Sequence, residues 1–340
     1  MDGTSRSGED LSAAEIVAWG RDLVTPALQV VVKRLPTEIA DLAAHHFGWA
    51  SGGDGGKAVR ATLALLSAEA VGGQAADALD AAVAVELVHN FSLLHDDVMD
   101  GDRTRRHRPT AWVAFGVPAA ILAGDALLAL AGHVLAESDG PLAGPGPSWL
   151  AEALLALVEG QNADLNLAGR AQVGLTECVE MAAGKTAALL GASCALGACA
   201  GGAGTARTAA LKEFGDQLGL AFQLVDDLLG IWGDPRVTGK PVRADLAARK
   251  RSLPVVAALN AGGAAARELA ERYASPEPFG EEGELAVAAL IERAGGRDWA
   301  RAEARRRLDA ALAALAAAGP VPRAAARLTR IAHLVVDRDR

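Results

Sequence analysis

Residues 81–100 read Ala-Ala-Val-Ala-Val-Glu-Leu-Val-His-Asn-Phe-Ser-Leu-Leu-His-Asp-Asp-Val-Met-Asp, an apolar run that ends in three aspartates. We expect one long helix over residues 76–99, because the run is too long and too irregular for an alternating strand. Asp96 and Asp100 then lie on one helix face, about 6 Å apart along the axis. Like charges at this spacing destabilise a helix unless a cation offsets them. Magnesium, which takes carboxylate, water and phosphate oxygens, would do so.

An acidic triplet at a helix end is more often a solvated surface feature than a metal site. That interpretation is weaker here, because residues 81–94 are too apolar for an exposed helix. A second pair, Asp226 and Asp227, also ends an apolar run, at residues 218–225, and a loop rich in cations follows each pair. The repeated arrangement indicates two helices that face each other across a shared site for a diphosphate and its magnesium ions.

The rest of the chain has the composition of a helical protein. Of its 340 residues, 51% are hydrophobic and only 4% are aromatic, and alanine dominates the apolar residues. Alanine is the best helix former, and the alternating β-branched runs of strands are nearly absent. We therefore expect an all-α protein, with a disordered start at residues 1–10 and one domain over residues 11–337. Further helices are expected at residues 11–32, 36–47, 57–70, 118–136, 147–168, 175–200 and 206–231.

The net charge of −9 argues against nucleic acid as a partner, because phosphate backbones are bound mainly by lysine and arginine. Small anionic substrates remain possible if the cations gather in one cleft. Cys178, Cys194 and Cys199 have no metal-ligand spacing and are expected to be small buried residues. The sequence has no recognisable signal peptide and no uninterrupted apolar run of about eighteen residues, so we expect no membrane span and a cytoplasmic location.

Basic side chains lie beside both acidic motifs. The planar fork of arginine matches phosphate oxygens, and the free N–H groups at a helix start also favour anions. The triplet Gly184-Lys185-Thr186 is not a Walker phosphate loop, because the upstream glycine spacing is wrong. Any single cation would more often be solvated, but the combined placement indicates a site for phosphate groups. The cations are Lys57, Arg60, Arg103, Arg105, Arg106, Arg108, Lys185, Lys240 and Lys250.

Taken in order, these motifs resemble those of the trans-isoprenyl diphosphate synthases (polyprenyl synthetases) over roughly residues 20–335. Leu94-His-Asp-Asp-Val-Met-Asp-Gly-Asp-Arg-Thr-Arg-Arg106 is similar to the family's first aspartate-rich motif with its paired arginines. Phe222-Gln-Leu-Val-Asp-Asp-Leu-Leu-Gly230 is similar to the second. The other motifs fall in the family's order: Gly56-Lys57-Ala-Val-Arg60, Glu86-Leu-Val-His89, Lys185-Thr186 and Gly239-Lys240-Pro241. The resemblance implies a single-domain bundle of long antiparallel helices around a central cavity.

The resemblance also implies a reaction, in which isopentenyl diphosphate lengthens an allylic diphosphate with the help of up to three magnesium ions. Diphosphate leaves to give an allylic cation, the alkene attacks it, and a proton then departs, most simply to the released diphosphate. The sequence offers no activated nucleophile or Ser-His-Asp set, which fits catalysis by electrostatic stabilisation in a water-poor pocket.

Roles follow by position in the resembling motifs. Asp96 and Asp100, supported by Asp97, would bind two magnesium ions, and Asp226, with Asp227 beside it, would bind a third. A histidine in an apolar helix is more often a core residue, but the family position favours a binding role for His89. The allylic diphosphate would contact Arg105, Lys185, Thr186, Gln223 and Lys240. Isopentenyl diphosphate would be bound by Lys57, Arg60, His89 and Arg106, and Lys250 is a further substrate-binding candidate.

Two residues before the first motif are expected to control product length. In the resembling synthases, bulk at the positions of Phe91 and Ser92 limits the chain. A single aromatic at the farther position, as here, resembles the pattern of enzymes that make the 20-carbon geranylgeranyl diphosphate. The alternative is that Phe91 is a core residue that packs against a neighbouring helix.

The chain departs from the family pattern at Ala58, Ala61, His107, Gly230 and Arg243. Gly230 stands where the second motif normally carries its third aspartate. We expect that aspartate to lie outside the direct ligands, so Gly230→Asp should have a small effect, although weaker binding of the third magnesium ion is an alternative.

Three functions remain open from the sequence. The first is a homodimeric synthase with a short product, most simply geranylgeranyl diphosphate, with farnesyl or 25-carbon diphosphate as alternatives. The second is a class I terpene cyclase, which would need no site for isopentenyl diphosphate; the presence of Lys57, Arg60, His89 and Arg106 speaks against it. The third is a non-catalytic partner subunit, for which Gly230 is the sole hint.

Overall fold

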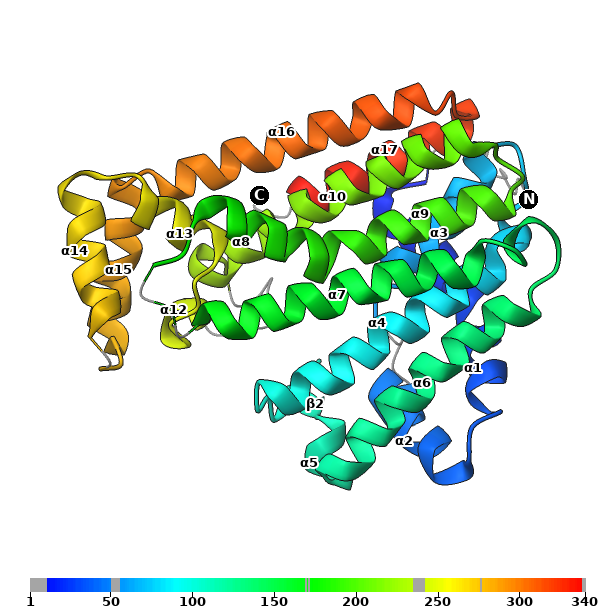
Figure 1. Ribbon diagram of the computed structural model, residues 1–340, viewed down its shortest axis with the longest axis horizontal. Helices are drawn as coiled ribbons and strands as arrows, with labels where there is room; N and C mark the ends of the chain where they lie inside the picture. Colours follow the sequence, from blue (N-terminus) through cyan, green and yellow to red (C-terminus); the bar gives the residue numbers. More distant parts are fainter. Residues whose placement is uncertain are drawn as a thin grey trace, which may run out of the picture. The chain divides into compact units, whose positions relative to one another are not determined.

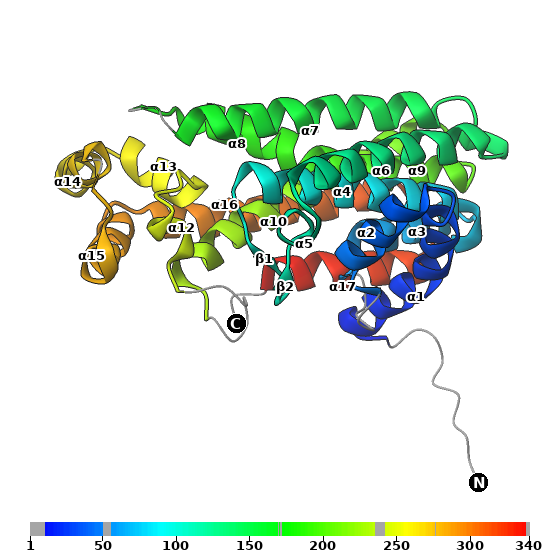
Figure 2. The ribbon, with the colours of Figure 1, turned by 90° about the horizontal axis from the view of Figure 1, so that it is seen from below.

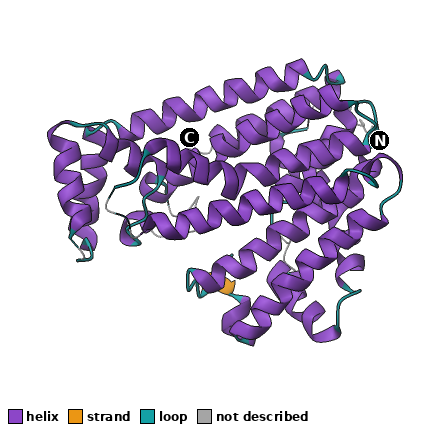
Figure 3. Cartoon of the chain, in the orientation of Figure 1, coloured by secondary structure: helices purple, strands orange, loops and turns teal. Residues whose placement is uncertain are grey.

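The structure is a computed structural model and describes residues 11–49, 56–168, 170, 172–234, 242–275 and 277–337. These residues are almost entirely helical (Figure 3). In the described ranges the strands are two residues each, β1 (Thr104–Arg105) and β2 (Arg108–Pro109), which pair antiparallel inside the basic loop. The all-α prediction is confirmed. The disorder predicted for residues 1–10 lies outside the described residues.

The predicted helices form close to their expected bounds. The helix expected over residues 76–99 consists of a 3-10 turn followed by the long α4. In chain order the helices are α1 (Ala13–Val32), α2 (Thr37–Phe47), α3 (Val59–Ala70), η2 (Ala75–Ala78), α4 (Leu79–Met99), α5 (Ala111–Phe115), α6 (Val117–Glu137), η3 (Gly140–Leu142), α7 (Gly146–Ala168), α8 (Leu175–Ala182), η4 (Ala183–Ala187), α9 (Ala188–Ala200), α10 (Thr205–Trp232), α12 (Ala244–Ala247), α13 (Leu253–Asn260), α14 (Gly263–Ala274), α15 (Gly280–Arg293), α16 (Gly296–Ala317) and α17 (Pro322–Val336).

The chain divides into two compact units, each assembled from separate segments. Units of this kind can belong to one domain, so the single domain expected over residues 11–337 stays a prediction. The first unit consists of Met1–Leu154, Leu189–Glu213 and Ala314–Ile331, and the second of Leu155–Ala188, Phe214–Ala313 and Ala332–Arg340.

Helix α4 is the centre of the first unit, where it packs against α1, α3 and α6. Figure 1 shows α4, in cyan, running alongside α6. Its residues from Ala81 to Leu94 are buried with few interruptions, because a helix that is apolar on nearly every side must be enclosed to remove that surface from water. The enclosure ends over the aspartates that follow: Asp97 is still buried, Asp96 is half-buried, and Asp100, at the C-cap, is exposed.

The second unit has two adjoining cores. The later part of α10 contributes Leu220, Leu224 and Leu228 to one core, which also contains residues of α8, α13 and α16. The other core lies between α13, α14 and α15, around Leu269 and Val287. Helices α14 and α15 lie side by side in both views (Figures 1 and 2).

The helix predicted over residues 175–200 is interrupted by a feature that the sequence pattern did not indicate. Between α8 and α9 the chain makes the wider π-helical turn η4, which contains Lys185 and Thr186. Such turns inside α-helices occur frequently at functional sites, because the extra residue redirects the side chains.

Two segments in the described residues are long and apolar enough to cross a membrane, by length and composition alone. They are Val117–Glu137, in which 44% of the most apolar window is buried inside the protein, and Leu175–Ala200, in which 78% is buried. A buried core helix of a soluble protein passes the same test, so the expected lack of a membrane span stays a prediction.

Candidate active site

The first aspartate motif lies at the C-terminal end of α4. Asp96 is half-buried, and Asp100 is exposed at the C-cap, where its N–H donates to the Asp96 carbonyl at 2.8 Å. Helical geometry therefore continues to Asp100 and keeps the two carboxylates one turn apart. These two predicted metal ligands are the accessible members of the motif.

Asp97, between them, differs in being only 1% exposed. Its Oδ1 accepts from the Nε of Arg105 at 2.8 Å and from Nη2 at 2.7 Å, so one carboxylate oxygen receives both arms of the guanidinium. Burial raises the pKa of Asp97, and Arg105 opposes that shift. Asp97 thus fixes Arg105, a predicted diphosphate ligand that is carried by the short strand β1, to the end of α4.

Glu86 is a further site residue. It belongs to the motif Glu86-Leu-Val-His89, but the sequence pattern predicts no role for it. It is 5% exposed, and its Oε1 accepts from the Ala61 N–H at 3.1 Å at the start of α3. Burial raises the pKa of Glu86 and lowers that of Arg60, while each charge favours the ionised form of the other. Glu86 is therefore the buried counter-ion of Arg60. Its signal in the sequence was a lone acid in an apolar helix, three residues before His89.

The predicted ligands of isopentenyl diphosphate gather around this pair. Burial, followed by the charges of Arg60, Arg106 and Arg105, lowers the pKa of His89 well below its ordinary value. His46 of α2, which the sequence did not single out, has its pKa lowered to about 3 by burial and by Arg106. The charges of Arg105 and Arg106 act on both imidazoles, so this part of the first unit has a positive potential that suits an anion. Lys57, exposed before α3, precedes Ala58, which holds a left-handed φ of +47° at the N-cap.

Several buried polar atoms in this region have no hydrogen-bond partner among the described residues: His46 Nε2, Arg60 Nε, Asn90 Oδ1 and Asp97 Oδ2. A buried polar atom left without a partner costs about 1–3 kcal/mol, so native proteins rarely tolerate several together unless water or a ligand completes them. The concentration of such atoms around Arg60 and Asp97 fits a site that binds a polar ligand.

The second aspartate motif lies near the end of α10, in the other unit. Asp226 is half-buried, whereas Asp227 is 3% exposed and accepts from Gln223 Nε2 and from the Leu253 N–H, both at 2.8 Å. The Lys250 Nζ lies 3.6 Å from Asp227 Oδ1, and this contact raises the pKa of Lys250. Asp227 thus fixes a cation, as Asp97 does in the first motif.

The predicted residues Lys185, Thr186 and Gln223 come together in the second unit. The Thr186 hydroxyl donates to Gln223 Oε1 at 2.6 Å, so Gln223 joins Thr186 to Asp227. Lys185 Nζ donates to Asp164 of α7 at 2.5 Å. The π-turn approaches α7 so closely that a Cβ at Gly160 would lie 2.2 Å from the Lys185 nitrogen. The remaining predicted residue of this group, Lys240, lies outside the described residues.

Asp164 and Gln161 are further residues that the sequence reading missed. Asp164 pairs with Lys185, and Gln161 lies one turn earlier on α7, 8% exposed, with neither side-chain polar atom hydrogen-bonded within the described ranges. The sequence feature that could have indicated them is their spacing: an amide and an acid three residues apart lie on one face of a helix.

Gly230, the main departure from the family pattern, lies against a carboxylate. A Cβ at this position would lie 2.3 Å from Asp245 Oδ2 and 2.5 Å from its Cγ, far inside van der Waals contact. Asp245, on α12, therefore fills the space beside α10 in which a side chain at 230 would begin. A side chain at position 230 would require the Asp245 carboxylate to shift, and the small effect expected of Gly230→Asp stays a prediction.

Magnesium fits the residues at both motifs. The half-buried or exposed carboxylates of Asp96, Asp100 and Asp226 are hard oxygen ligands. Among the described residues no group of three or more His, Cys, Asp or Glu side chains is arranged to hold a metal ion unaided. Magnesium usually binds through one or two carboxylates together with water and substrate phosphates, which the accessible carboxylates of Asp96, Asp100 and Asp226 would allow.

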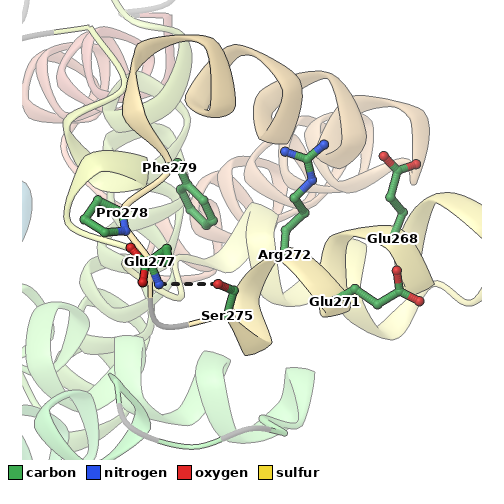
Figure 4. Close-up of a pocket in the computed structure, with 7 residues that line it drawn as sticks. All are labelled: Glu268, Glu271, Arg272, Ser275, Glu277, Pro278 and Phe279. Atoms are coloured by element: carbon green, nitrogen blue, oxygen red, sulfur yellow. Dashed lines mark hydrogen bonds between the residues drawn. The ribbon is translucent and has the colours of Figure 1, made fainter.

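A surface pocket of about 460 Å³ lies on the α14–α15 hairpin (Figure 4). It contains none of the predicted site residues. Its lining consists of Glu268, Glu271, Arg272, Ser275, Glu277, Pro278 and Phe279.

An all-helical chain with two acidic motifs, each of which fixes a cation, has the residues that an enzyme acting on diphosphates would need. The chain matches the Polyprenyl synthetase family over residues 48–290 and belongs to that family of trans-prenyltransferases. It is 45% identical over 332 residues to a (2E,6E)-farnesyl diphosphate synthase of Mycobacterium tuberculosis, covering 95% of this chain and 92% of the relative. It is 48% identical over 297 residues to a geranylgeranyl diphosphate synthase of the same organism, covering 85% of each.

Solved structures agree with this membership. A polyprenyl synthetase from Streptomyces coelicolor matches with a TM-score of 0.88 and 49% identity, covering 95% of this chain and 99% of that one. A geranylgeranyl pyrophosphate synthetase from Pyrococcus horikoshii matches with a TM-score of 0.86 and 31% identity, covering 95% and 98%. The fold therefore extends through essentially the whole chain.

Proposed function

We propose that this protein joins isopentenyl diphosphate to an allylic diphosphate and releases geranylgeranyl diphosphate. The observation that carries the proposal is the cation cluster around α4, with Arg60 balanced by Glu86 and Arg105 held by Asp97. A terpene cyclase binds one diphosphate and has no use for a second set of phosphate ligands. The set Arg60, His89 and Arg106 supports a condensing enzyme over that alternative.

Up to three magnesium ions are proposed as cofactors, two at Asp96 and Asp100 and one at Asp226. Magnesium supplies positive charge that neutralises the leaving diphosphate. The chain's own contribution is to hold cations in fixed positions. Lys185 is aligned by Asp164, and Thr186 is aligned by Gln223, so both can meet an incoming diphosphate without rearrangement.

The proposed chemistry needs an apolar environment for the carbon chain. No side chain is required as a nucleophile, because the allylic carbon is attacked by the alkene of isopentenyl diphosphate. The proton that leaves is taken by the released diphosphate. The apolar residues of α4 that precede Asp96 would exclude water from the cation while it exists.

The length of the product is proposed to depend on Ser92 and Phe91. Ser92 is small, and its hydroxyl is already satisfied by donating to the His89 carbonyl at 2.8 Å. Phe91 is buried and packs edge-on against His95, with 4.8 Å between ring centres. His95 in turn contacts the Ile121 carbonyl of α6. This packing fits a core residue, and it would also fit a residue at the floor of a product pocket. Farnesyl diphosphate is the second candidate product, because relatives of both kinds match over most of the chain.

A homodimer is proposed as the working assembly. Four apolar side chains on α5 and α6 are at least 40% exposed, namely Phe115, Val117, Ile121 and Leu122. Exposed apolar groups gathered on neighbouring helices are typical of subunit interfaces. Light scattering coupled to size exclusion would test the assembly, and a monomer at micromolar concentration would contradict it.

The product assignment is tested by incubating the purified protein with isopentenyl diphosphate, magnesium and each allylic diphosphate in turn. We expect chromatography of the dephosphorylated products to show the 20-carbon alcohol as the main species. A product that stops at 15 carbons from every primer would replace geranylgeranyl by farnesyl diphosphate in the assignment.

A further inference from the structure

The segment 242–250 of the second unit contains two arginines in strained backbone conformations. Arg243 has φ +59° and Arg249 has φ +54°, in the left-handed region that side-chain-bearing residues rarely adopt. This conformation is unfavourable for a residue with a side chain, so it persists only where surrounding contacts hold it. The segment contains α12 and ends at Lys250, the cation that Asp227 fixes.

Arg249 is held by the backbone of the α14–α15 hairpin. Its Nη1 donates to the Glu277 carbonyl at 2.9 Å, and its Nη2 lies within donating distance of three carbonyls, those of Arg272 (3.2 Å), Tyr273 (3.0 Å) and Ser275 (2.6 Å). The last carbonyls of a helix have no partner inside it and carry the negative end of the helix dipole. Arg249 therefore acts as the C-terminal cap of α14 from a distant part of the chain.

Aromatic rings complete the contact. The Arg249 guanidinium carbon lies 4.2 Å from the centre of the Phe279 ring and 5.5 Å from that of Tyr273, distances at which a cation is attracted to a ring face. The Tyr273 hydroxyl donates to the Lys250 carbonyl at 3.4 Å. Arg249 is thus bound by residues that also line the pocket in Figure 4, through their backbone carbonyls and the Phe279 ring.

The other end of the segment has a second attachment. Arg243 Nε lies 3.6 Å from Glu284 Oε2 of α15, and both side chains are less than 20% exposed. Contacts between α12 and α15 accompany this pair. The segment is therefore fastened to the hairpin at both of its strained residues.

The segment presents two charged groups to α10, one between these attachments and one directly after the second. Asp245 lies over Gly230, and Lys250 lies beside Asp227. The Lys250 N–H also donates to the Asp245 carbonyl at 2.8 Å, so the two residues are tied together. A shift of the segment would move both charges relative to the second aspartate motif.

We propose that Arg249 is a positioning residue: by binding the α14–α15 hairpin it sets Lys250 and Asp245 against the second aspartate motif. The proposal rests on the proposed function for its effect on substrate binding, because Lys250 is a substrate-binding candidate there. Arg243 supports the same attachment from the other end. The hairpin, which contains none of the predicted site residues, thereby gains a role in the active site.

Arg249→Gly tests the proposal most sharply, because glycine adopts a positive φ without strain. If the Arg249 side chain made no contribution of its own, replacing it by glycine would leave the stability of the protein unchanged or raise it. We expect instead that acetylation of Lys250 by an amine-reactive ester, followed by mass spectrometry of the native protein, speeds up about tenfold relative to the exposed Lys33, since losing the guanidinium contacts frees the segment. The KM for the allylic diphosphate should rise about tenfold while kcat changes by less than about threefold, the signature of altered binding.

Arg293→Ala is the matched control. Arg293 also ends a helix of this hairpin and pairs with Glu268, but it is 62% exposed, so its loss should leave both readouts unchanged. Wild-type acetylation and KM in Arg249→Gly would overturn the proposal. If that variant does not fold, Arg249→Lys, which keeps the charge and loses the fork, carries the test, and wild-type values in it would also overturn the proposal. The acetylation rate of Lys250 can be measured without turnover, so it tests the position of Lys250 even if the protein does not catalyse prenyl transfer.

Discussion

At the level of single residues, the two aspartate pairs share one pattern of burial and ion pairing. In each pair the second aspartate is buried and holds a cation that comes later in the chain, Arg105 for Asp97 and Lys250 for Asp227. The first aspartate, Asp96 or Asp226, is half-buried. We infer that the first member of each pair serves the metal and the second positions a phosphate ligand.

Variants of the first pair should separate these roles. Asp96→Ala should lower kcat by about a thousandfold or more, because charge stabilisation of the leaving group is the main source of catalysis. Asp97→Asn should act mainly on the KM of the allylic diphosphate, because it releases Arg105. Steady-state kinetics at saturating magnesium would measure both, and near-normal turnover of Asp96→Ala would refute the assignment of the metal site.

His46 should make the protein sensitive to acid. Its pKa is lowered from the ordinary 6.5 to about 3, so above pH 6.5 the imidazole is neutral in both the folded and the unfolded chain and costs nothing. As the pH falls from 6.5 toward 3, only the unfolded chain takes up the proton, and the free energy of unfolding decreases by up to about 1.4 kcal/mol per pH unit.

The His46→Gln variant isolates this effect, because glutamine does not titrate. We expect its free energy of unfolding in urea to fall less than that of the wild type between pH 6.5 and 4.5. His133→Gln, at a histidine of α6 that is 53% exposed, is the control and should follow the wild type. An identical loss in His46→Gln and wild type would show that His46 is protonated freely in the folded state.

Gly230 gives a third prediction at this scale. A Cβ at position 230 would lie 2.3 Å from Asp245 Oδ2, so Gly230→Ala requires that side chain to shift. If its contacts hold the Asp245 side chain in place, overpacking of this kind costs about 1–3 kcal/mol. We expect a lower melting temperature and a higher magnesium concentration for half-maximal activity. Pairing the change with Asp245→Gly should restore part of the melting temperature, and a Gly230→Ala variant as stable as the wild type would refute the steric account.

At the scale of elements, the long apolar helices were predictable and the irregular turns were not. Periodicity and alanine content predicted α4, α6 and α10 to within a few residues, because long apolar runs with many helix-forming residues specify long helices. The π-turn η4 leaves no trace in an apolar pattern, since it depends on the close approach of α7 at Gly160. The close approach of Asp245 to Gly230 could not be predicted for a similar reason. The two residues are fifteen positions apart, on α12 and α10, and their contact depends on how these helices pack.

The ion pairs of the site show the same limit. Arg105, Lys185 and Lys250 could be selected from the sequence, because cations beside acidic motifs suggest phosphate binding. Their partners Asp97 and Asp227 were assigned to metal, and Asp164 and Glu86 received no role. Which acid holds which cation depends on burial and distance, and neither can be read from spacing along one chain.

Helix α4 also contains the proposed determinant of product length. Phe91→Ala should open the floor of the pocket and extend the product to 25 carbons or more, whereas Ser92→Phe should shorten it toward 15. Product chromatography on both variants measures this directly. If Phe91 is only a core residue packed on His95, its truncation should lower stability by about 3–5 kcal/mol and leave the product unchanged.

For the whole molecule, two compact units each contain one aspartate motif with its own buried acid and cation. The family match spans residues 48–290 and includes both motifs. The match to the Streptomyces coelicolor structure extends the same fold over 95% of the chain. The family match therefore spans both units and both motifs.

The central claim is that the protein joins two diphosphate substrates, and incorporation of radiolabelled isopentenyl diphosphate into acid-labile product tests it most directly. We predict incorporation that requires an allylic diphosphate and magnesium and that Asp96→Ala abolishes. Release of diphosphate from the allylic substrate without incorporation would instead define a cyclase. Neither release nor incorporation by the folded, purified protein would contradict the account and favour a non-catalytic partner subunit.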